Sequence, residues 1–219
     1  FKNTYNSLIC NDEINKSVVL THSNSQALSY NKIIREMLFG SEQQDVAVGD
    51  LLMITRNCYC HDVELFNGTI VRVQDVNPKI EKHIANVGKN RVELNFREIT
   101  IAVKKTNIRL LILDDFLLDK NGSLSFEQQK ALWAHFEQRM SKMGIKPGTD
   151  DFKENIKRDP YFNALQCKYG YAITCHKSQG GEWDNVIVSM DTFMGKFNET
   201  FFRWAYTAVT RAKRQLWHM

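Results

Sequence analysis

The sequence has 219 residues, of which 43% are hydrophobic and 25% charged, and its 29 basic and 25 acidic side chains give a formal net charge of +4. These values are typical of one large globular domain or two smaller ones, and they exclude a disordered or collagen-like chain. The longest apolar stretch, residues 110–118, contains Asp114 and Asp115. It is far shorter than the roughly 20 residues of a membrane-spanning helix, so we expect no membrane partner.

The five cysteines are odd in number and irregularly spaced, so they do not predict a disulfide framework. We expect reduced thiols and a cytoplasmic protein. The segment Cys58-Tyr59-Cys60-His61 lacks the usual spacing of zinc ligands, so no metal site is predicted. The chain begins at Phe1 rather than Met and shows no signal peptide, and we expect it to be a piece of a longer protein.

The first predicted elements are a buried strand at residues 18–20 and a helix that Ser23, Asn24 or Ser25 can cap. Gly40 is expected to end the helix. A strand, a turn and a helix in this order are typical of an α/β sheet. The apolar face of the helix would consist of Ala27, Tyr30, Ile34 and Leu38.

Short β-like runs then follow one another closely, which predicts a small antiparallel barrel. Asn67-Gly68 is a strong hairpin signal, because both residues tolerate a positive φ. We expect the aromatic side chains of Tyr59 and Phe66 to pack inside this barrel, although they could instead face DNA. The predicted strands cover residues 50–55, 69–76, 91–96 and 99–104.

A helix is predicted over residues 125–143, where Ser125 and Gln128 can form a capping box and Leu132, Phe136 and Met140 recur at helical spacing. The stretch 144–160 is rich in turn residues. The three prolines, Pro78, Pro147 and Pro160, all stand where we expect the chain to turn.

The α/β pattern returns with strands at 171–174 and 186–188 and a helix at 201–213. The predicted fold is therefore an α/β parallel-sheet domain, interrupted by an inserted barrel. Its expected boundaries are 1–45 together with 161–219 for the sheet domain, 46–110 for the barrel and 111–160 for a helical, turn-rich connector.

Two segments carry the chemistry. Residues 170–184 read Gly-Tyr-Ala-Ile-Thr-Cys-His-Lys-Ser-Gln-Gly-Gly-Glu-Trp-Asp, and residues 206–213 read Tyr-Thr-Ala-Val-Thr-Arg-Ala-Lys. Polar side chains at the carboxyl end of a strand lie where open α/β sheets bind ligands. The glycine pair lets backbone amides approach an anion. An arginine on the following helix can stabilise charge on a transferring phosphoryl group.

These two segments resemble motifs V and VI of superfamily 1 DNA helicases, especially the RecD-like branch, which includes the exonuclease V alpha subunit. Residues 18–24, 48–57 and 66–70 look like the strand before the barrel and the opening of the SH3-like barrel that such helicases insert into their second RecA-like motor domain. Residues 107–160 are not covered by the resemblance. It implies a DNA helicase or translocase that moves on single-stranded DNA or at a junction with duplex.

The resemblance also implies roles for individual residues. Arg211 would be the arginine that reaches the γ-phosphate of ATP, and Glu182 would bind the ribose. The remaining ATP-binding residues would be Gly180, Gly181, Lys177 and Gln179. Lys177, Ser178 and Gln179 would also connect the nucleotide side to the DNA side. The residues implied to contact DNA are Thr174, His176 and Ser178, together with Thr21 and Asn24.

No Gly-x4-Gly-Lys-Ser/Thr phosphate-binding loop occurs in the 219 residues. We therefore expect ATP and Mg²⁺ to be bound mainly by an N-terminal RecA-like domain of the same protein, and this chain to be inactive alone. Other recombination or repair subunits could be partners. Residues 46–110 and 161–219 each carry +3, which suits a nucleic-acid surface.

Two other functions stay open at this point. A binding module without motor activity would bind DNA through residues 46–110 alone, and a change at Arg211 would not matter to it. A nuclease would need a compact cluster of acidic residues and a lysine around a metal ion, which the sequence does not show. Local alternatives also remain: Arg211 could pair with a surface carboxylate, His176 could be structural, and Trp183 and Trp204 are expected to be core aromatics.

Overall fold

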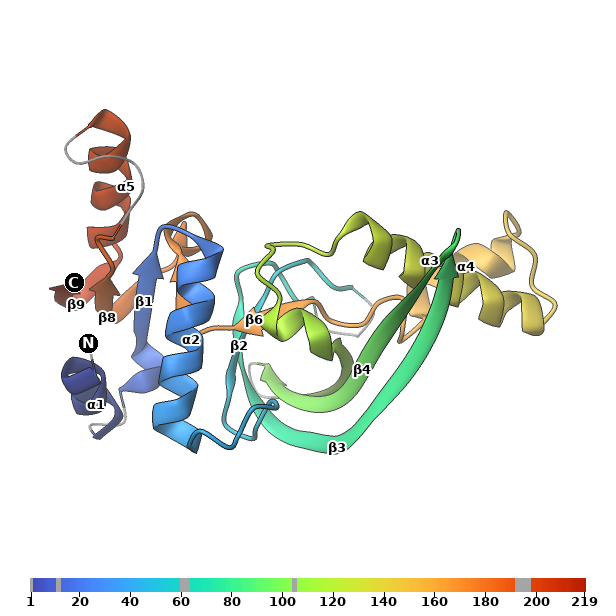
Figure 1. The fold of residues 1–219 in the computed structure, drawn as a ribbon, viewed down its shortest axis with the longest axis horizontal. Helices are drawn as coiled ribbons and strands as arrows, with labels where there is room; N and C mark the ends of the chain where they lie inside the picture. The colour runs from blue at the N-terminus through green and yellow to red at the C-terminus, as the bar shows by residue number, and fades with distance from the viewer. Residues whose placement is uncertain (1, 11–12, 60–63, 104–105, 192–197) are drawn as a thin grey trace. The chain divides into compact units, whose positions relative to one another are not determined.

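The computed structural model describes residues 2–10, 13–59, 64–103, 106–191 and 198–219. The chain divides into two compact units, which are considered separately. Unit 1 consists of residues 1–46 and 169–219, and unit 2 of residues 47–168 (Figure 1). The part of the chain described has no helix long and apolar enough to cross a lipid bilayer.

Unit 1 is built on a four-stranded sheet in the order β7-β1-β8-β9, in which every neighbouring pair is parallel. Its strands are β1 (Ser17–Thr21), β7 (Ala172–Thr174), β8 (Trp183–Val188) and β9 (Ala212–His218). Its helices are α1 (Lys2–Cys10), α2 (Asn24–Phe39) and α5 (Glu199–Val209). The predicted α/β fold with a parallel sheet is confirmed.

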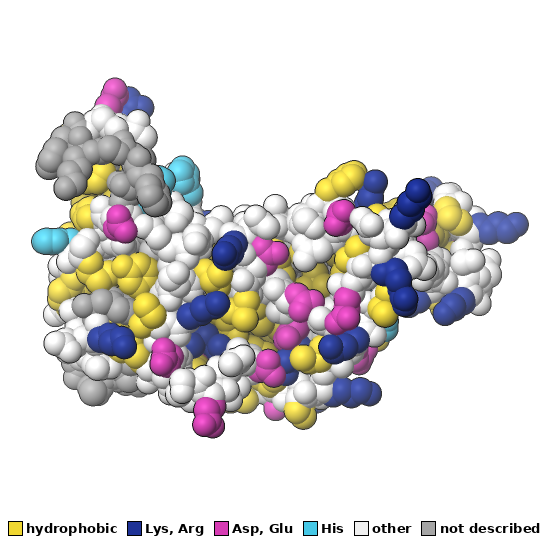
Figure 2. Space-filling model, in the orientation of Figure 1, with side chains coloured by type: hydrophobic (Ala, Val, Ile, Leu, Met, Phe, Trp, Pro, Cys, Tyr) yellow, Lys and Arg dark blue, Asp and Glu magenta, His cyan; other side chains and the backbone are white. Residues whose placement is uncertain are grey.

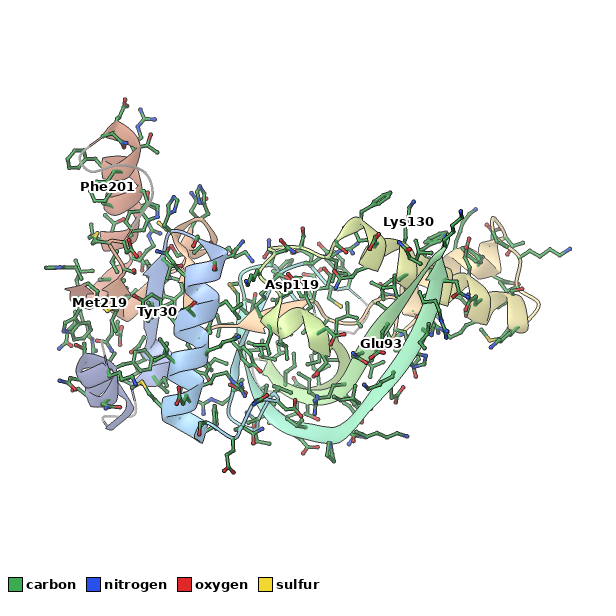
Figure 3. All side chains as sticks on the ribbon, in the orientation of Figure 1. Tyr30, Glu93, Asp119, Lys130, Phe201 and Met219 are labelled. Atoms are coloured by element: carbon green, nitrogen blue, oxygen red, sulfur yellow. The ribbon has the colours of Figure 1, made fainter. Side chains whose placement is uncertain are left out.

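The central strand β1 is buried along its whole length, because sheet neighbours flank it on both sides. Helix α2 begins after Ser23, whose side chain forms a capping box with Gln26. Of the predicted apolar face, Ala27 and Ile34 are buried, and the Tyr30 hydroxyl donates a hydrogen bond to Ser189 Oγ at 3.3 Å (Figure 3). The same helix also buries Asn31, which pairs with both backbone polar groups of Ala172 at 2.8 and 2.9 Å.

The helix predicted over residues 201–213 is right only as far as Val209. Thr210 follows the helix as its C-cap, and residues 212–218 form the strand β9, parallel to β8. Strand β9 lies at the edge of the sheet and most of its residues are exposed, so it lacks the apolar alternation by which a half-buried strand is recognised. Arg211 therefore lies in the turn between helix and strand, and Lys213 lies on the strand.

Unit 2 contains the five-stranded sheet β5-β4-β3-β2-β6. Its strands are β2 (Leu51–Ile54), β3 (Ile70–Val87), β4 (Asn90–Val103), β5 (Thr106–Leu113) and β6 (Cys167–Tyr169). Leu165, just before β6, forms a bridge with Ile112 of β5 and exchanges hydrogen bonds with Leu111 and Leu113 at 2.7 and 3.4 Å. The sheet thus joins its two outer strands, which is how a small barrel closes.

Strands β3 and β4 are much longer than predicted and form one curved hairpin (Figure 1). Pro78 does not end the first of them. The pairing register shifts between Val76 and Ile80, so Pro78 lies in a bulge, where its missing N–H breaks no ladder bond. Asn67-Gly68 does form a turn just before β3, with positive φ at Gly68, and Cys58 forms an isolated antiparallel bridge with Leu65 between β2 and this turn.

The remaining helices of unit 2 are α3 (Phe126–Lys142) and α4 (Asp150–Arg158). The predicted capping box of Ser125 and Gln128 is present, and Leu132, Phe136 and Met140 are buried. Helix α3 packs on β3 and β4, so residues 111–160 are part of the core of unit 2 rather than a separate connector. Residues 161–168, expected in the sheet domain, also belong to unit 2, because they pair with its barrel.

A polar and aromatic cluster joins α3 to the long hairpin. His135 Nε2 lies 3.0 Å from His83 Nδ1, and both rings contact Phe96 and Tyr161. Arg139 makes a two-pronged ion pair with the buried Asp159 at 2.5 and 2.8 Å. Burial, and then the positive charge of Arg139, lower the pKa of His135 to about 4. His135 is therefore neutral in the folded protein at neutral pH.

Candidate functional site

The carboxyl ends of β1 and β7 bring Thr21 and Thr174 side by side in the parallel register. Thr21 is fully buried, and its hydroxyl donates to the carbonyl oxygens of Ser23 and Ile173 at 3.1 and 3.4 Å. This residue fixes the end of the strand and offers no side-chain atom to a DNA strand. Asn24, the next predicted contact, is exposed in the first turn of α2.

A pocket of about 210 Å³ opens beside this edge. It brings the predicted residues His176 and Gln179 together with His22 and Trp204, which the motif analysis did not assign to the site. Trp204 is only 7% exposed, as expected for a core aromatic. Its indole N–H and the Nδ1 atom of His22 are nevertheless buried without a hydrogen-bond partner among the described residues. The other lining residues are Cys175, Thr200, Arg203 and Thr207.

Unpaired polar atoms cost free energy when they are buried, so two of them in the walls of one pocket indicate a ligand or water that completes their bonds. The rings of His22 and Trp204 are 6.1 Å apart, edge to face. Phe202 and Tyr206 are exposed on α5, next in sequence to the pocket residues Arg203 and Thr207. The region around the carboxyl ends of β1 and β7 therefore combines hydrogen-bonding groups with exposed aromatic rings.

Residues 175–182 connect β7 to β8 and run from the carboxyl ends of the strands back to their amino ends, since both strands are parallel to β1, which lies between them. The crossing begins with a short 3-10 helix, Cys175–Ser178. Ser178 is fully buried and its hydroxyl donates to the Cys175 carbonyl at 2.7 Å. Partial burial lowers the pKa of the Lys177 amine, and no described carboxylate pairs with it.

Glycine is required at positions 180 and 181 for two different physical reasons. Gly180 has φ of +79°, the left-handed region that favours glycine. Gly181 has an ordinary φ, but a Cβ atom there would lie 2.5 Å from Cη2 of Trp183. The indole of Trp183 thus packs directly on the backbone of Gly181, and the sequence motif by itself did not reveal this contact.

Arg211 is held beside this glycine turn by three hydrogen bonds to uncharged acceptors. Its Nε donates to the Thr207 carbonyl at 3.1 Å, and Nη1 donates to the Gly181 carbonyl at 3.3 Å. Nη2 lies 3.3 Å from the Thr210 hydroxyl. No described carboxylate pairs with Arg211, so its positive charge is left uncompensated. The alternative reading of a surface ion pair is wrong for the described residues.

Glu182, in contrast, has a cationic partner. Its carboxylate lies 3.2 Å from Nζ of Lys213, and both side chains are more than half exposed. The adjacent pair Arg214 and Asp184 is looser, at 3.7 Å. Exposed pairs of this kind contribute little to stability, so Glu182 stays free to exchange its partner.

The predicted residues thus fall into two groups rather than one. Thr174 and His176 lie at the carboxyl ends of the strands, whereas Gly181, Glu182 and Arg211 lie at the start of β8, where Trp183 N–H donates to the Arg211 carbonyl at 3.0 Å. The donor set of the second group fits a phosphate, because an uncompensated guanidinium and a glycine turn lie together. Among the described residues no three His, Cys, Asp or Glu side chains are grouped to hold a metal ion.

Tyr59 and Phe66, which we expected to pack inside the barrel, are 64% and 49% exposed, so that expectation is wrong. Figure 2 shows Lys and Arg side chains spread over the visible face and mixed with Asp and Glu. The described side chains form no continuous basic patch on this face. Cys58, Cys167 and Cys175 are buried and not disulfide-bonded, while Cys60 and His61 lie outside the described residues.

Residues 169–219 match the protein family described as the UvrD-like helicase C-terminal domain. The match contains β7, β8, α5 and β9, and therefore both groups of site residues. For this segment it confirms the resemblance to the C-terminal region of superfamily 1 helicases, and it supports a helicase-related role.

Two curated relatives are themselves uncharacterised. One, from Acanthamoeba polyphaga mimivirus, is 24% identical over 96% of this chain and 49% of its own length. The other, from Methanocaldococcus jannaschii, is 39% identical over 28% of this chain and 5% of its own length. The chain thus spans about half or less of the proteins it matches.

Similar solved structures include the Pif1 helicase from Candida albicans, with 13% identity and a TM-score of 0.43. Pif1 from Bacteroides bound to single-stranded DNA shows 11% identity and a TM-score of 0.41. Each comparison covers 93% of this chain, and 44% and 40% of the respective helicase chains.

Proposed function

We propose that this chain is the C-terminal half of an ATP-dependent helicase or translocase that moves on single-stranded DNA. The carrying observation is Arg211, whose guanidinium has no carboxylate partner among the described residues and lies on the glycine turn within the segment that matches the UvrD-like helicase C-terminal domain. We further propose the RecD-like branch, because the barrel unit is inserted between α2 and β7 of the parallel sheet.

In this proposal Arg211 completes an ATP site that an N-terminal RecA-like domain of the longer protein supplies. Bound ATP with Mg²⁺ provides the phosphoryl group whose transfer to water releases the free energy for movement. Arg211 would stabilise negative charge on the γ-phosphate, and Glu182 would exchange Lys213 for a ribose hydroxyl. Lys177 and the turn of Gly180 and Gly181 would support the same side. Gln179, which lines the pocket of His22 and Trp204, would connect this side to the DNA side.

The DNA strand would lie at the carboxyl ends of β1 and β7, opposite the end of the strands where Arg211 lies. His176 and Gln179 are exposed at the pocket of His22 and Trp204, and Thr174 ends the neighbouring strand. Hydrogen bonds from this pocket and stacking on the aromatic rings of α5 would hold the strand without reading its sequence. Asn24 could add a contact from the first turn of α2, whereas Thr21 and Ser178 would act by fixing the backbone.

The crossing segment 175–182 connects the two sides covalently. A shift of the glycine turn when ATP binds would pull on the short helix that carries His176, because only a few residues separate them. Alternating closure and release would then move the grip on DNA. We expect this chain alone not to hydrolyse ATP, since it has no phosphate-binding loop.

The test uses the longer protein that contains this chain. We expect Arg211→Ala to lower the kcat of DNA-stimulated ATP hydrolysis by about 10³-fold or more, the range of an arginine finger. Arg211→Lys should restore little, because an ammonium does not reproduce the planar fork of donors. Arg214→Ala, three residues further along on β9, is the matched control.

Full DNA-stimulated ATPase activity in Arg211→Ala would overturn the finger role. If DNA binding also proved indifferent to His22 and His176 while the barrel unit carried it, the binding module without motor activity would be the better description.

A further inference from the structure

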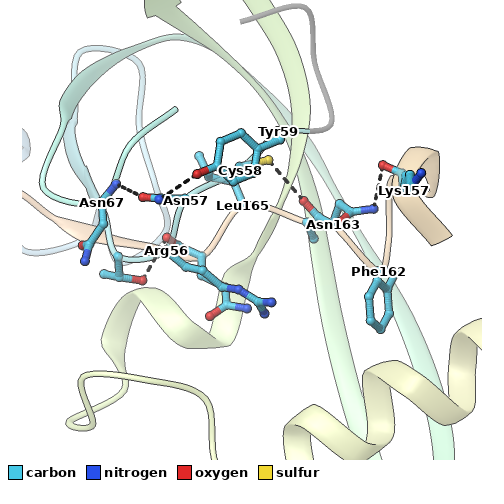
Figure 4. Close-up of a pocket in the computed structure, with 12 residues that line it drawn as sticks. Arg56, Asn57, Cys58, Tyr59, Asn67, Lys157, Phe162, Asn163 and Leu165 are labelled. Atoms are coloured by element: carbon cyan, nitrogen blue, oxygen red, sulfur yellow. Dashed lines mark hydrogen bonds between the residues drawn. The ribbon is translucent and has the colours of Figure 1, made fainter. Parts of the chain in front are cut away.

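One pocket of unit 2 is lined by residues outside 170–184 and 206–213, the two segments that resemble motifs V and VI. It has a volume of about 650 Å³, within the roughly 300–1,000 Å³ typical of ligand sites. Figure 4 shows its walls: the loop that follows β2, and the segment between α4 and β6. The second wall lies mostly outside the regions covered by the helicase resemblance. The lining residues that could contact a ligand through their side chains include Arg56, Tyr59, Lys157, Phe162 and Gln166.

The charged side chains among these residues are all positive. Arg56 is exposed and pairs with no described carboxylate. Lys157 has only a long contact with Glu154, at 3.7 Å, and both side chains are well exposed. Such a pair is weak in water, so Lys157 can turn to a ligand at little cost. The pocket therefore suits an anionic group.

Tyr59 has an exposed aromatic ring at the rim of the pocket, and hydrogen bonds fix its position. The Tyr59 hydroxyl accepts a hydrogen bond from Asn57 Nδ2 at 2.9 Å, and Asn57 Oδ1 accepts one from the Asn67 N–H at 2.7 Å (Figure 4). On the other wall, Phe162 is fixed by ring contacts with Trp133 and Phe136 at 5.9 and 5.5 Å. Two positioned rings offer flat surfaces on which a planar group can stack.

Gln166 adds a hydrogen-bonding side chain to the wall of the pocket. It is 8% exposed, and its backbone carbonyl accepts two hydrogen bonds from Thr55, both at 2.9 Å. Its side-chain amide makes no hydrogen bond to the described residues, yet it lines the pocket. An amide that presents both a donor and an acceptor to a pocket is suited to the edge of a base.

We propose that this pocket binds one nucleotide of a single-stranded nucleic acid. The base stacks on Tyr59 with its edge toward the Gln166 amide, and its phosphate is bound by Arg56 and Lys157. The site is separate from that of Arg211 and does not depend on the motor role. A strand and a free nucleoside monophosphate share this chemistry, and we favour the strand because the pocket is open and carries its cations on exposed side chains.

The experiment measures binding of fluorescein-labelled oligothymidylate to the full 219-residue chain by anisotropy at several salt concentrations. We expect Tyr59→Ala to raise the Kd about 5- to 100-fold, the range for loss of one stacked base. Arg56→Gln should reduce the slope of log K against log salt by about 0.7, the value for one phosphate on a single strand. The matched controls are Phe66→Ala, in the same loop, and Arg109→Gln, on β5 and paired with Glu98.

Ultraviolet cross-linking of bromodeoxyuridine-substituted oligothymidylate, mapped by mass spectrometry, reports on the pocket itself. We expect adducts on Tyr59 or Phe162, and we expect them to persist in Arg211→Ala, so that failure of the motor proposal leaves this result standing. Unchanged affinity in both pocket variants, or adducts only elsewhere, would overturn the proposal. Thymidine monophosphate or an acidic peptide that binds as tightly as the strand would overturn the choice of ligand.

Discussion

Arg211 donates a hydrogen bond from Nη1 to the backbone carbonyl of Gly181 at 3.3 Å, although the two residues are 30 positions apart. The contact joins the turn after α5 to the turn before β8, and the adjacent Trp183 N–H donates back to the Arg211 carbonyl. The position of the guanidinium is therefore determined by backbone atoms of the glycine turn, so changes in that turn should affect Arg211 directly.

Gly181→Ala should lower the free energy of unfolding of unit 1 by about 1–3 kcal/mol, the usual cost of forcing an extra methyl group into a packed site. The cause is the 2.5 Å approach of the new Cβ to Trp183. Denaturant unfolding followed by tryptophan fluorescence measures it. The double variant Gly181→Ala/Trp183→Leu should recover part of the loss, and purely additive effects would contradict the proposed clash.

Glu182→Gln should change the free energy of unfolding by less than about 1 kcal/mol, because its pair with Lys213 is exposed to water. In the longer protein the same variant should raise the KM for ATP, since the amide is a weaker acceptor for a ribose hydroxyl. Asp184→Asn, which loses only the 3.7 Å contact with Arg214, is the control. An unchanged KM for ATP would remove Glu182 from the nucleotide site.

His22→Leu should separate stability from binding. Replacing the ring removes a buried nitrogen that has no partner in the described part of the chain, so the melting temperature should stay the same or rise. Affinity for single-stranded DNA should fall, because the pocket loses an acceptor beside Trp204. Calorimetry and anisotropy on one preparation measure both quantities. A lower melting temperature with unchanged affinity would show that His22 only supports the fold.

Acid should loosen α3 from the long hairpin. The pKa of His135 is lowered from 6.5 to about 4 in the folded state, so between these values the unfolded chain binds the extra proton and the folded chain does not. The stabilisation is fully present above pH 6.5 and is lost as the pH falls toward 4. The full loss between these two pH values is on the order of 3 kcal/mol.

Hydrogen exchange of the α3 amides at pH 7 and pH 5 measures this loss. His135→Asn should flatten the dependence, whereas His218→Gln, on the exposed edge strand, should not. The charged or titratable groups that act on His135 are His83, Arg139, Asp159 and Lys142. The pH dependence of exchange in His135→Asn is therefore compared with that of the unaltered chain over the same pH range. An equally steep dependence in His135→Asn would assign the effect to those neighbours.

Local signals were sufficient for the elements that bury a regular face. Helix α3 begins at the predicted capping box and buries the predicted face. Both the cap and the 3.6-residue spacing of apolar side chains involve residues that are close together in the sequence, so they can be recognised without the fold. Strand β9 was missed because an edge strand exposed on most positions carries no such period. The boundary near residue 168 was missed because the pairing of residues 164–168 with β2 and β5 depends on segments more than 50 positions away.

The candidate site shows the same division. The motif spacing identified Gly181, Glu182 and Arg211, and these three do lie together. It did not identify His22 or Trp204, whose significance comes from two unpaired atoms that appear only once β1 and α5 are placed. Nor did it show that the predicted residues occupy opposite ends of the parallel strands.

The chain passes into unit 2 just before β2 and leaves it on β6, and these two strands are neighbours in the sheet of the barrel. Both junctions of the insert therefore lie close together on one pair of hydrogen-bonded strands. Because the two junctions are close together, such an inserted domain can be gained, lost or exchanged in evolution without a change in the parallel-sheet domain that carries it. The same geometry makes the residues flanking 46 and 169 the natural splice points for a minimal parallel-sheet domain.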